Sequence, residues 1–252
     1  TKYGDTYDCV NFYKQLAFDH PLLKNHDIYP KIKPILASTL QNSDTSAAHE
    51  ANESSGIWLK ERGCPFETSN NNSELKRTSI SSQGYKLAIV QIPNNPNNKF
   101  SSAEMSASLW NPRIESQQHT ACRLKIQKGS DNLQTGWRVD PTLYGDNKTR
   151  YFVHFQDLAN GNWWLLFGES NEQVGFWPQR LFSNMASFAT SVEWGGVAYS
   201  PPSVSEPPMG SNCFPIGDPN YDAYCRRLNI LNGKAEAVHI DKTTVCVDDS
   251  DR

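Results

Sequence analysis

From residue 84 onward, short apolar-rich runs alternate with turn signals, and this rhythm constrains the fold more than any other feature. Branched and aromatic side chains recur at two-residue spacing within the runs, as is typical of β-strands. Asn-Asn, Asn-Gly, Gly-Asp and Pro separate the runs. The pattern predicts an all-β sandwich. The predicted strands are residues 85–92, 103–110, 121–127, 133–139, 150–155, 162–168, 173–177 and 188–200.

The first 82 residues have a different composition. Residues 10–18 show the apolar spacing of a short amphipathic helix, which would end before His20-Pro21 because a residue preceding proline avoids helical backbone angles. Ser, Asn, Thr and Glu dominate residues 41–82, and this predicts a linker. The predicted organisation is an N-terminal segment over 1–45, a polar linker with Cys64 over 46–82, and a β-sandwich domain over 83–252.

Charge and hydropathy exclude several classes of partner. The net charge is −3 and the Lys and Arg residues are scattered, so we expect no nucleic acid partner. No apolar run approaches the roughly 20 residues that cross a bilayer, so we expect no membrane span. The six histidines are dispersed and no Gly-rich phosphate loop is present, so we predict neither a metal nor a cofactor.

Cysteines and sequons together indicate an oxidising, secretory compartment. The chain has six cysteines and no Cys-x-x-Cys pair, a spacing that favours disulfides over a metal cage. Sequons for N-glycosylation begin at Asn52, Asn71 and Asn147, in polar or turn-like stretches where a glycan would be exposed. We therefore predict a secreted glycoprotein.

Two predicted strands combine an apolar face with a polar face that contains glycine. Trp137 in 133–139 and Trp194 in 188–200 lie on the apolar faces. A glycine between polar side chains on a sheet surface suits a groove that holds an extended ligand. The predicted groove positions lie on the two polar faces: Gln134, Gly136, Arg138, Glu193, Gly195, Val197 and Tyr199.

Several long motifs resemble the neprosin family of plant secreted glutamic peptidases. CVNFYKQLAFDHPLLKNH (9–26) resembles the family's activation peptide, departing at Leu16 where proline is usual, and WLKERGCP (58–65) resembles the segment that closes it. The later motifs resemble successive landmarks of the peptidase domain: NLQTGWRVDPTLYGDNKTR, NGNWWLLFGE, VGFWP, SVEWGG and PPMGSNCFP. The family's segment after the RYFVHF strand is missing between these landmarks.

The resemblance implies a curved sandwich of two antiparallel sheets, with the substrate lying across one concave face. It also implies endopeptidase cleavage beside proline in acid, without a metal. Two facing glutamates would divide the proton transfers, one carboxylate taking a proton from the attacking water and one carboxylic acid polarising the peptide carbonyl.

The positions that match these two glutamates carry Gln134 and Val197 in this chain. Gln134 alone would be tolerated, since a related glutamic-peptidase lineage pairs Gln with Glu. Val197 has no titratable proton and no hydrogen-bond donor, and Glu193 lies about 13 Å from it along the strand. The motif comparison therefore predicts a protein with no catalytic pair.

We expect, on this resemblance, a secreted plant glycoprotein of the extracellular space, cell wall or vacuole that keeps the neprosin fold without peptidase activity. Its groove would bind an extended or proline-rich peptide, or a cell-wall polymer. One alternative is an active acid endopeptidase that cleaves beside proline. Another is a storage or defence protein.

The resemblance implies a disulfide between Cys9 and Cys64, because these cysteines lie in the two activation-peptide motifs. Residues 226–240 have a strand–turn–strand pattern around Asn232-Gly233, which favours pairing of Cys225 with Cys246. Cys122 and Cys213 would then form the third disulfide.

Overall fold

The computed structural model describes residues 8–11, 14, 68–71, 84–156, 162–168, 172–213, 216–238 and 243–247. Contacts divide the chain into two compact units, residues 1–75 with 160–181 and residues 76–159 with 182–252. Nearly all regular structure in the described residues is antiparallel strand, so the predicted all-β class is confirmed.

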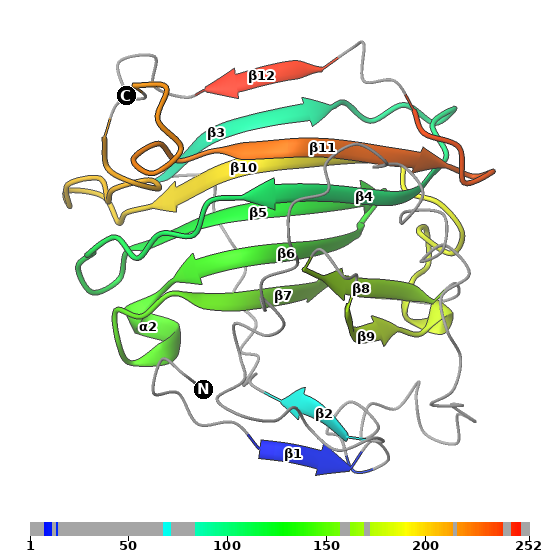
Figure 1. The fold of residues 1–252 in the computed structure, drawn as a ribbon, viewed down its shortest axis with the longest axis horizontal. Helices are drawn as coiled ribbons and strands as arrows, with labels where there is room; N and C mark the ends of the chain where they lie inside the picture. The colour runs from blue at the N-terminus through cyan, green and yellow to red at the C-terminus, as the bar shows by residue number, and fades with distance from the viewer. Residues whose placement is uncertain are drawn as a thin grey trace, which may run out of the picture. The chain divides into compact units, whose positions relative to one another are not determined.

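The larger unit contains a six-stranded antiparallel sheet in the order β12-β3-β10-β5-β6-β7 (Figure 1). β5 and β6 are adjacent in sequence and form a hairpin, whereas β10 joins the sheet between β3 and β5 from a distant part of the chain. The six strands are β3 (Tyr85–Ile92), β5 (His119–Lys128), β6 (Asp131–Val139), β7 (Arg150–Gln156), β10 (Ser191–Tyr199) and β12 (Thr244–Val247).

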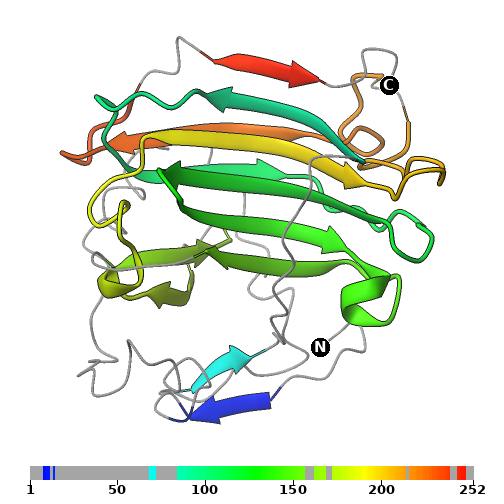
Figure 2. The ribbon, with the colours of Figure 1, turned by 180° about the vertical axis from the view of Figure 1, so that it is seen from behind.

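A second, two-stranded sheet made of β4 (Phe100–Ala107) and β11 (Cys225–Asn232) covers one face of the large sheet, as both ribbon views show (Figures 1 and 2). Two tryptophans of the large sheet connect the layers. The indole Nε1 of Trp194 donates to the Glu104 carbonyl at 3.1 Å, and that of Trp137 donates to the Ser108 carbonyl at 2.8 Å. Both tryptophans are buried, as the strand alternation predicted.

The core lies between the two sheets because the alternating apolar positions of β5, β6 and β10 face β4 and β11. Its largest fully buried apolar side chains come from both layers and from the segment before β10: Trp194, Phe182, Met185, Ile230, Val139 and Val192. Asp131 holds that segment in place, accepting hydrogen bonds from the backbone amides of Asn184 and Met185. The opposite face of the large sheet therefore carries the polar positions.

A short helix, α2 (Pro141–Tyr144), follows β6 directly. Asp140 caps it by accepting from the Leu143 amide at 3.0 Å, and Gly145 ends it with a left-handed conformation, φ 77°. Neither this helix nor β12 was predicted from the sequence, although Asp-Pro followed by Gly is a recognised helix signature.

The smaller unit contains two strand pairs. β1 (Asp8–Asn11) pairs with β2 (Thr68–Asn71), and β8 (Trp163–Phe167) pairs with β9 (Glu172–Trp177), which is followed by the 3-10 turn η3 (Gln179–Leu181). The helix predicted over 10–18 is wrong at its start, because residues 10 and 11 belong to β1. β8 and β9 group with the N-terminal residues, whereas the sequence placed them in the 83–252 domain.

Candidate functional site

Gln134 lies in a row of side chains that crosses the polar face of the large sheet. Its direct partner on β5 is Lys125, and the partner of Lys125 on β10 is Glu193, followed by Gln91 on β3. Directly opposed residues in antiparallel strands point to the same face. Gln134 and Glu193 are therefore two strands apart, about 10 Å between backbones, with β5 between them.

Arg123 of β5 fills the space between these two side chains. Its Nη1 donates to Gln134 Oε1 at 2.9 Å, its Nε donates to Glu193 Oε1 at 3.1 Å, and its Nη2 forms an ion pair with the same carboxylate. Lys125 Nζ lies 3.8 Å from Glu193 Oε2. The Arg123 and Glu193 side chains are only 18% and 15% exposed, so the ion pair is largely shielded from solvent.

Two glycines lie on either side of Arg123 in its own row, Gly136 on β6 and Gly195 on β10. Both have positive φ angles, 155° and 138°. A Cβ at Gly136 would lie 2.0 Å from the Cys122 carbonyl oxygen, and one at Gly195 would lie 2.2 Å from that of Ala88. Close strand approach thus requires glycine at these positions, and the absence of side chains leaves Arg123 room to extend across the face.

Val197 belongs to a different row, whose members on the neighbouring strands are Leu87, Ala121 and Arg138. It shares the polar face with Glu193, as the alternation predicted, but it is only 3% exposed. Gln134 and Val197 are the two positions that match the family's glutamates. Along β10, Val197 lies four residues beyond the position that is in the row of Gln134. Glu193, which the sequence comparison set aside as a substitute, is the carboxylate in the row of Gln134.

Three aromatic rings form a cluster at one end of this face. The His119 ring stacks on Tyr199 with centroids 5.1 Å apart, and Tyr85 lies 4.8 Å from Tyr199. Burial, with smaller contributions from Arg138 and Arg123, lowers the pKa of His119 to about 3. His119 is therefore a neutral ring at ordinary pH, and the cluster is an aromatic platform beside two guanidinium groups.

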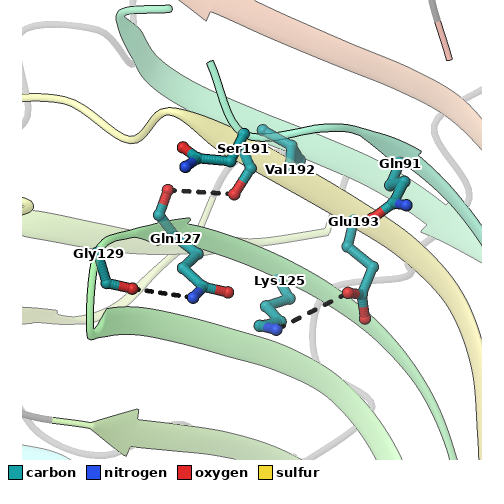
Figure 3. Close-up of a pocket in the computed structure, with 8 residues that line it drawn as sticks. Gln91, Lys125, Gln127, Gly129, Ser191, Val192 and Glu193 are labelled. Atoms are coloured by element: carbon teal, nitrogen blue, oxygen red, sulfur yellow. Dashed lines mark hydrogen bonds and ion pairs between the residues drawn. The ribbon is translucent and has the colours of Figure 1, made fainter. Parts of the chain in front are cut away.

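A polar pocket of about 250 Å³ opens at the other end of the face (Figure 3). Lys125, Gln127 and Glu193 contribute to it from β5 and β10, and Figure 3 shows the Lys125 and Glu193 side chains pointing toward one another. Burial lowers the pKa of Lys125, and the nearby Glu193 carboxylate opposes this shift. The pocket presents amide and charged groups, which suits hydrogen bonding to an extended backbone.

Five more of the predicted groove residues lie on the same face as Gln134. Gly136, Arg138, Glu193, Gly195 and Tyr199 all lie on this face. Arg138 is held by Asp140 through hydrogen bonds of 2.9 and 2.6 Å. Sequence reasoning missed the two cations of β5. The stretch ACRLKIQ does contain the signal, because Arg123 and Lys125 alternate with the buried Cys122, Leu124 and Ile126.

Two of the described cysteines lie close together. Cys122 Sγ lies 3.0 Å from Cys225 Sγ, and Cys213 is exposed, with no disulfide among these three. The pairs Cys122–Cys213 and Cys225–Cys246 stay predictions, since all three described cysteines line one cavity and the Cys246 side chain is not described. The Cys9–Cys64 pair involves Cys64, which lies outside the described residues.

Of the three sequon asparagines, Asn147 lies in the loop after α2 and is exposed. Asn71 belongs to β2, where side chains are not described, and Asn52 lies outside the described residues. In the described parts of the chain, no group of three or more His, Cys, Asp or Glu side chains is arranged to hold a metal ion. No described helix is long and apolar enough to cross a membrane.

Comparison with known protein families gives two matches. The sequence model of the family described as Neprosin matches residues 116–157 and 154–252, which together exceed half of the chain. The model described as Neprosin activation peptide matches residues 1–104. The two Neprosin stretches meet at the end of β7, where the sequence passes directly from RYFVHF to the NGNWW motif.

Proposed function

Because this chain belongs to the neprosin family, we propose that it is a member whose groove binds an extended peptide without cleaving it. The observation that carries this proposal is the position of Arg123. Its guanidinium contacts both Gln134 and Glu193, the two side chains of the row that could act on a peptide bond.

These contacts oppose water activation. A general base must accept a proton from water within hydrogen-bond reach, and the acid partner must donate one. Glu193 Oε1 is bound by Arg123 and Oε2 lies near Lys125, so both carboxylate oxygens face cations. Gln134 is an amide that can polarise a carbonyl but cannot exchange a proton at ordinary acidity. Among the described side chains of the row, none supplies a second carboxylic acid, and the next position, His154 on β7, has no described side chain.

The same face suits a proline-containing peptide. Gln91 of β3, Gln127 of β5 and Gln134 of β6 lie on this face, and side-chain amides can pair with the backbone groups of an extended chain. Tyr85 and Tyr199 offer ring faces of the kind that proline-rich segments pack against. A cell-wall polymer with hydroxyl groups would use the same amides.

We extend the proposal to a plant protein, exported through the secretory pathway and glycosylated, with its place outside the cell or in the vacuole. The family membership, the three sequons and the six cysteines support this part.

The alternative is an acid endopeptidase that uses Gln134 with Glu193, and their shared row favours it. Glu193 would supply the acid and Gln134 the amide, from two strands of the same face. A Gln–Glu pair is the arrangement of the related lineage noted above. Binding without cleavage and acid endopeptidase activity differ in one observable. Only the endopeptidase forms cleaved peptide, and it needs Glu193 to do so.

The test is a titration of a fluorescent proline-containing peptide against the full chain near pH 5, with mass spectrometry of the peptide afterwards. Intact peptide and saturable binding are expected, with binding several-fold weaker for Tyr199→Ala. The matched control is Lys99→Gln, an exposed lysine away from the groove residues, which should bind like the wild type. Unchanged binding in Tyr199→Ala, or no binding at all, would overturn the groove proposal. Products that vanish in Glu193→Gln would establish the alternative.

A further inference from the structure

We infer that Cys122 and Cys225 form a disulfide that links the two sheets of the sandwich. Cys122 lies on the core face of β5, opposite the groove, and Cys225 is the first residue of β11 in the covering sheet. Their sulfur atoms are 3.0 Å apart, which is about 1 Å longer than a disulfide bond. The cross-link would join strands 103 residues apart.

Neighbouring hydrogen bonds hold the two cysteines in register with one another. Trp137, the β6 partner of Cys122, donates from Nε1 to the Ser108 carbonyl at 2.8 Å. Ser108 in turn binds Tyr224, the residue before Cys225. The Ser108 amide donates to the Tyr224 carbonyl at 3.0 Å, and Ser108 Oγ accepts from the Tyr224 amide at 2.9 Å and donates to the Tyr224 carbonyl at 3.4 Å. A chain of hydrogen bonds from Trp137 through Ser108 to Tyr224 therefore holds the backbone beside Cys122 and the backbone beside Cys225 close together.

The pair lies against apolar side chains. Cys122 is 8% exposed and belongs to a cluster with Ile114, Trp137 and Val139, against which Cys225 packs from the other sheet. As free thiols, the buried Cys122 and the half-buried Cys225 would each lie beside a sulfur atom that is only a weak hydrogen-bond partner. A disulfide would replace that weak contact with a bond.

Oxidation could reach the pair from one side. Cys225 is only half-buried, and both cysteines line a cavity of about 620 Å³ that also borders Cys213. Contact with Cys122 lowers the pKa of the Cys225 thiol, while contact with Cys225, and then burial, raises that of Cys122. The more acidic and more accessible thiol is therefore Cys225, and the thiolate is the reactive form.

The balanced reaction consists of two thiol–disulfide exchanges with a low-molecular-weight disulfide such as oxidised glutathione. The Cys225 thiolate attacks that disulfide, forms a mixed disulfide and releases one glutathione thiolate. The Cys122 thiolate then attacks the Cys225 sulfur and releases the second. The two protein thiols lose two electrons and two protons, which the two glutathione molecules carry away.

The direct test is peptide mapping of the purified full chain, with free thiols alkylated before digestion under non-reducing conditions. A linked peptide containing Cys122 and Cys225 is expected, two hydrogen masses lighter than the sum of its parts. Cys122 linked to Cys213, Cys225 linked to Cys246, or alkylation of both Cys122 and Cys225 would overturn the inference.

Trapping of the mixed disulfide gives a second test. Reduced Cys122→Ala protein incubated with oxidised glutathione should gain one glutathione at Cys225, whereas reduced Cys225→Ala should leave Cys122 unmodified. A glutathione on Cys122 instead, or none on Cys225, would contradict the order of attack.

Thermal unfolding with and without a reductant gives a third test of the disulfide, independent of mass spectrometry. Reduction should lower the midpoint of thermal unfolding by on the order of 5–15 °C more in Cys213→Ser protein than in Cys225→Ser protein, because only the former keeps the cross-link. Since Cys213 is exposed, Cys213→Ser serves as the matched control. An equal effect of reduction on the two variants would count against the disulfide.

Discussion

Glu193 lies in the same cross-strand row as Gln134, two strands away, and Arg123 reaches from the intervening strand to bind both. The polar face is thus organised around a cation. In the reaction that the family resemblance implies, two acids would act there. The Arg123 guanidinium between an amide and a carboxylate, with Lys125 beside the same carboxylate, is consistent with peptide binding and opposes proton transfer.

Removal of Arg123 is expected to destabilise the fold. Arg123→Met leaves the Glu193 carboxylate with Lys125 alone, and since both side chains are mostly buried the free energy of unfolding should fall by about 2–3 kcal/mol. Glu193→Met in addition should recover part of that loss, because it removes the carboxylate that has lost Arg123, although Lys125 then loses Glu193 as well. A double-mutant cycle in urea would measure the coupling. A loss below about 0.5 kcal/mol for Arg123→Met would show that the ion pair contributes little.

Stability should decline in acid because of His119. Its folded-state pKa is about 3, below the ordinary value near 6.5, so between these values the unfolded chain binds more protons than the folded one. Each pH unit in that window costs up to about 1.4 kcal/mol. His119→Phe keeps a ring beside Tyr199 but cannot titrate. Unfolding free energies measured from pH 7 to pH 3 should therefore fall less steeply in His119→Phe, and parallel curves would contradict the assignment.

Gly195→Ala should be strongly destabilising. The new Cβ would lie 2.2 Å from the Ala88 carbonyl oxygen, at a φ of 138° that side chains rarely adopt. We expect a loss of about 3 kcal/mol or more in urea unfolding, or no folded protein. Gly175→Ala is the matched control, since nothing lies within 4 Å of its ideal Cβ. A loss of under about 1 kcal/mol in Gly195→Ala would mean that the strands can separate there.

Local sequence pattern predicted most of the strands but could not supply the register between distant ones. The run 85–92 coincides with β3, because its alternation matches a two-faced strand. Residues 10 and 11 have helical spacing yet pair with residues 68 and 69 as strand, so a tertiary contact overrides local preference. β12 is four residues long at the edge of the sheet and has little pattern to read.

The same limit applied to the site. Alternation placed Gln134 and Glu193 on the polar faces of their strands. It does not say which residue of one strand is paired with which residue of the neighbouring strand. The β5–β6 hairpin is local, with Lys128 paired to Asp131 across Gly129-Ser130. The β10–β5 pairing joins residues more than 60 positions apart, and only the folded sheet shows that Glu193 reaches the row of Gln134. Arg123 and Lys125 were overlooked because they lie outside the family's catalytic motifs.

Asn147 should carry an N-linked glycan when the protein is made in a secretory host. It is exposed in the loop between α2 and β7, where a sugar meets no packed surface. Enzymatic removal of N-glycans should lower the mass of the peptide containing Asn147, and Asn147→Gln should abolish that shift with little change in stability. An unmodified Asn147 peptide from such a host would refute this prediction.

The central claim is that Arg123, bound to both Gln134 and Glu193, leaves the groove unable to cleave a peptide. The most direct test is the intact mass of the full chain, and of a proline-containing peptide added to it, after incubation at pH 3 to 5. We predict that both stay whole, so that residues 1–64 remain attached. Arg123→Gln combined with Gln134→Glu should be the first variant to show cleavage, since it removes the cation and supplies a second acid. Fragments cut beside proline in the wild type, and absent in Glu193→Gln, would contradict the account.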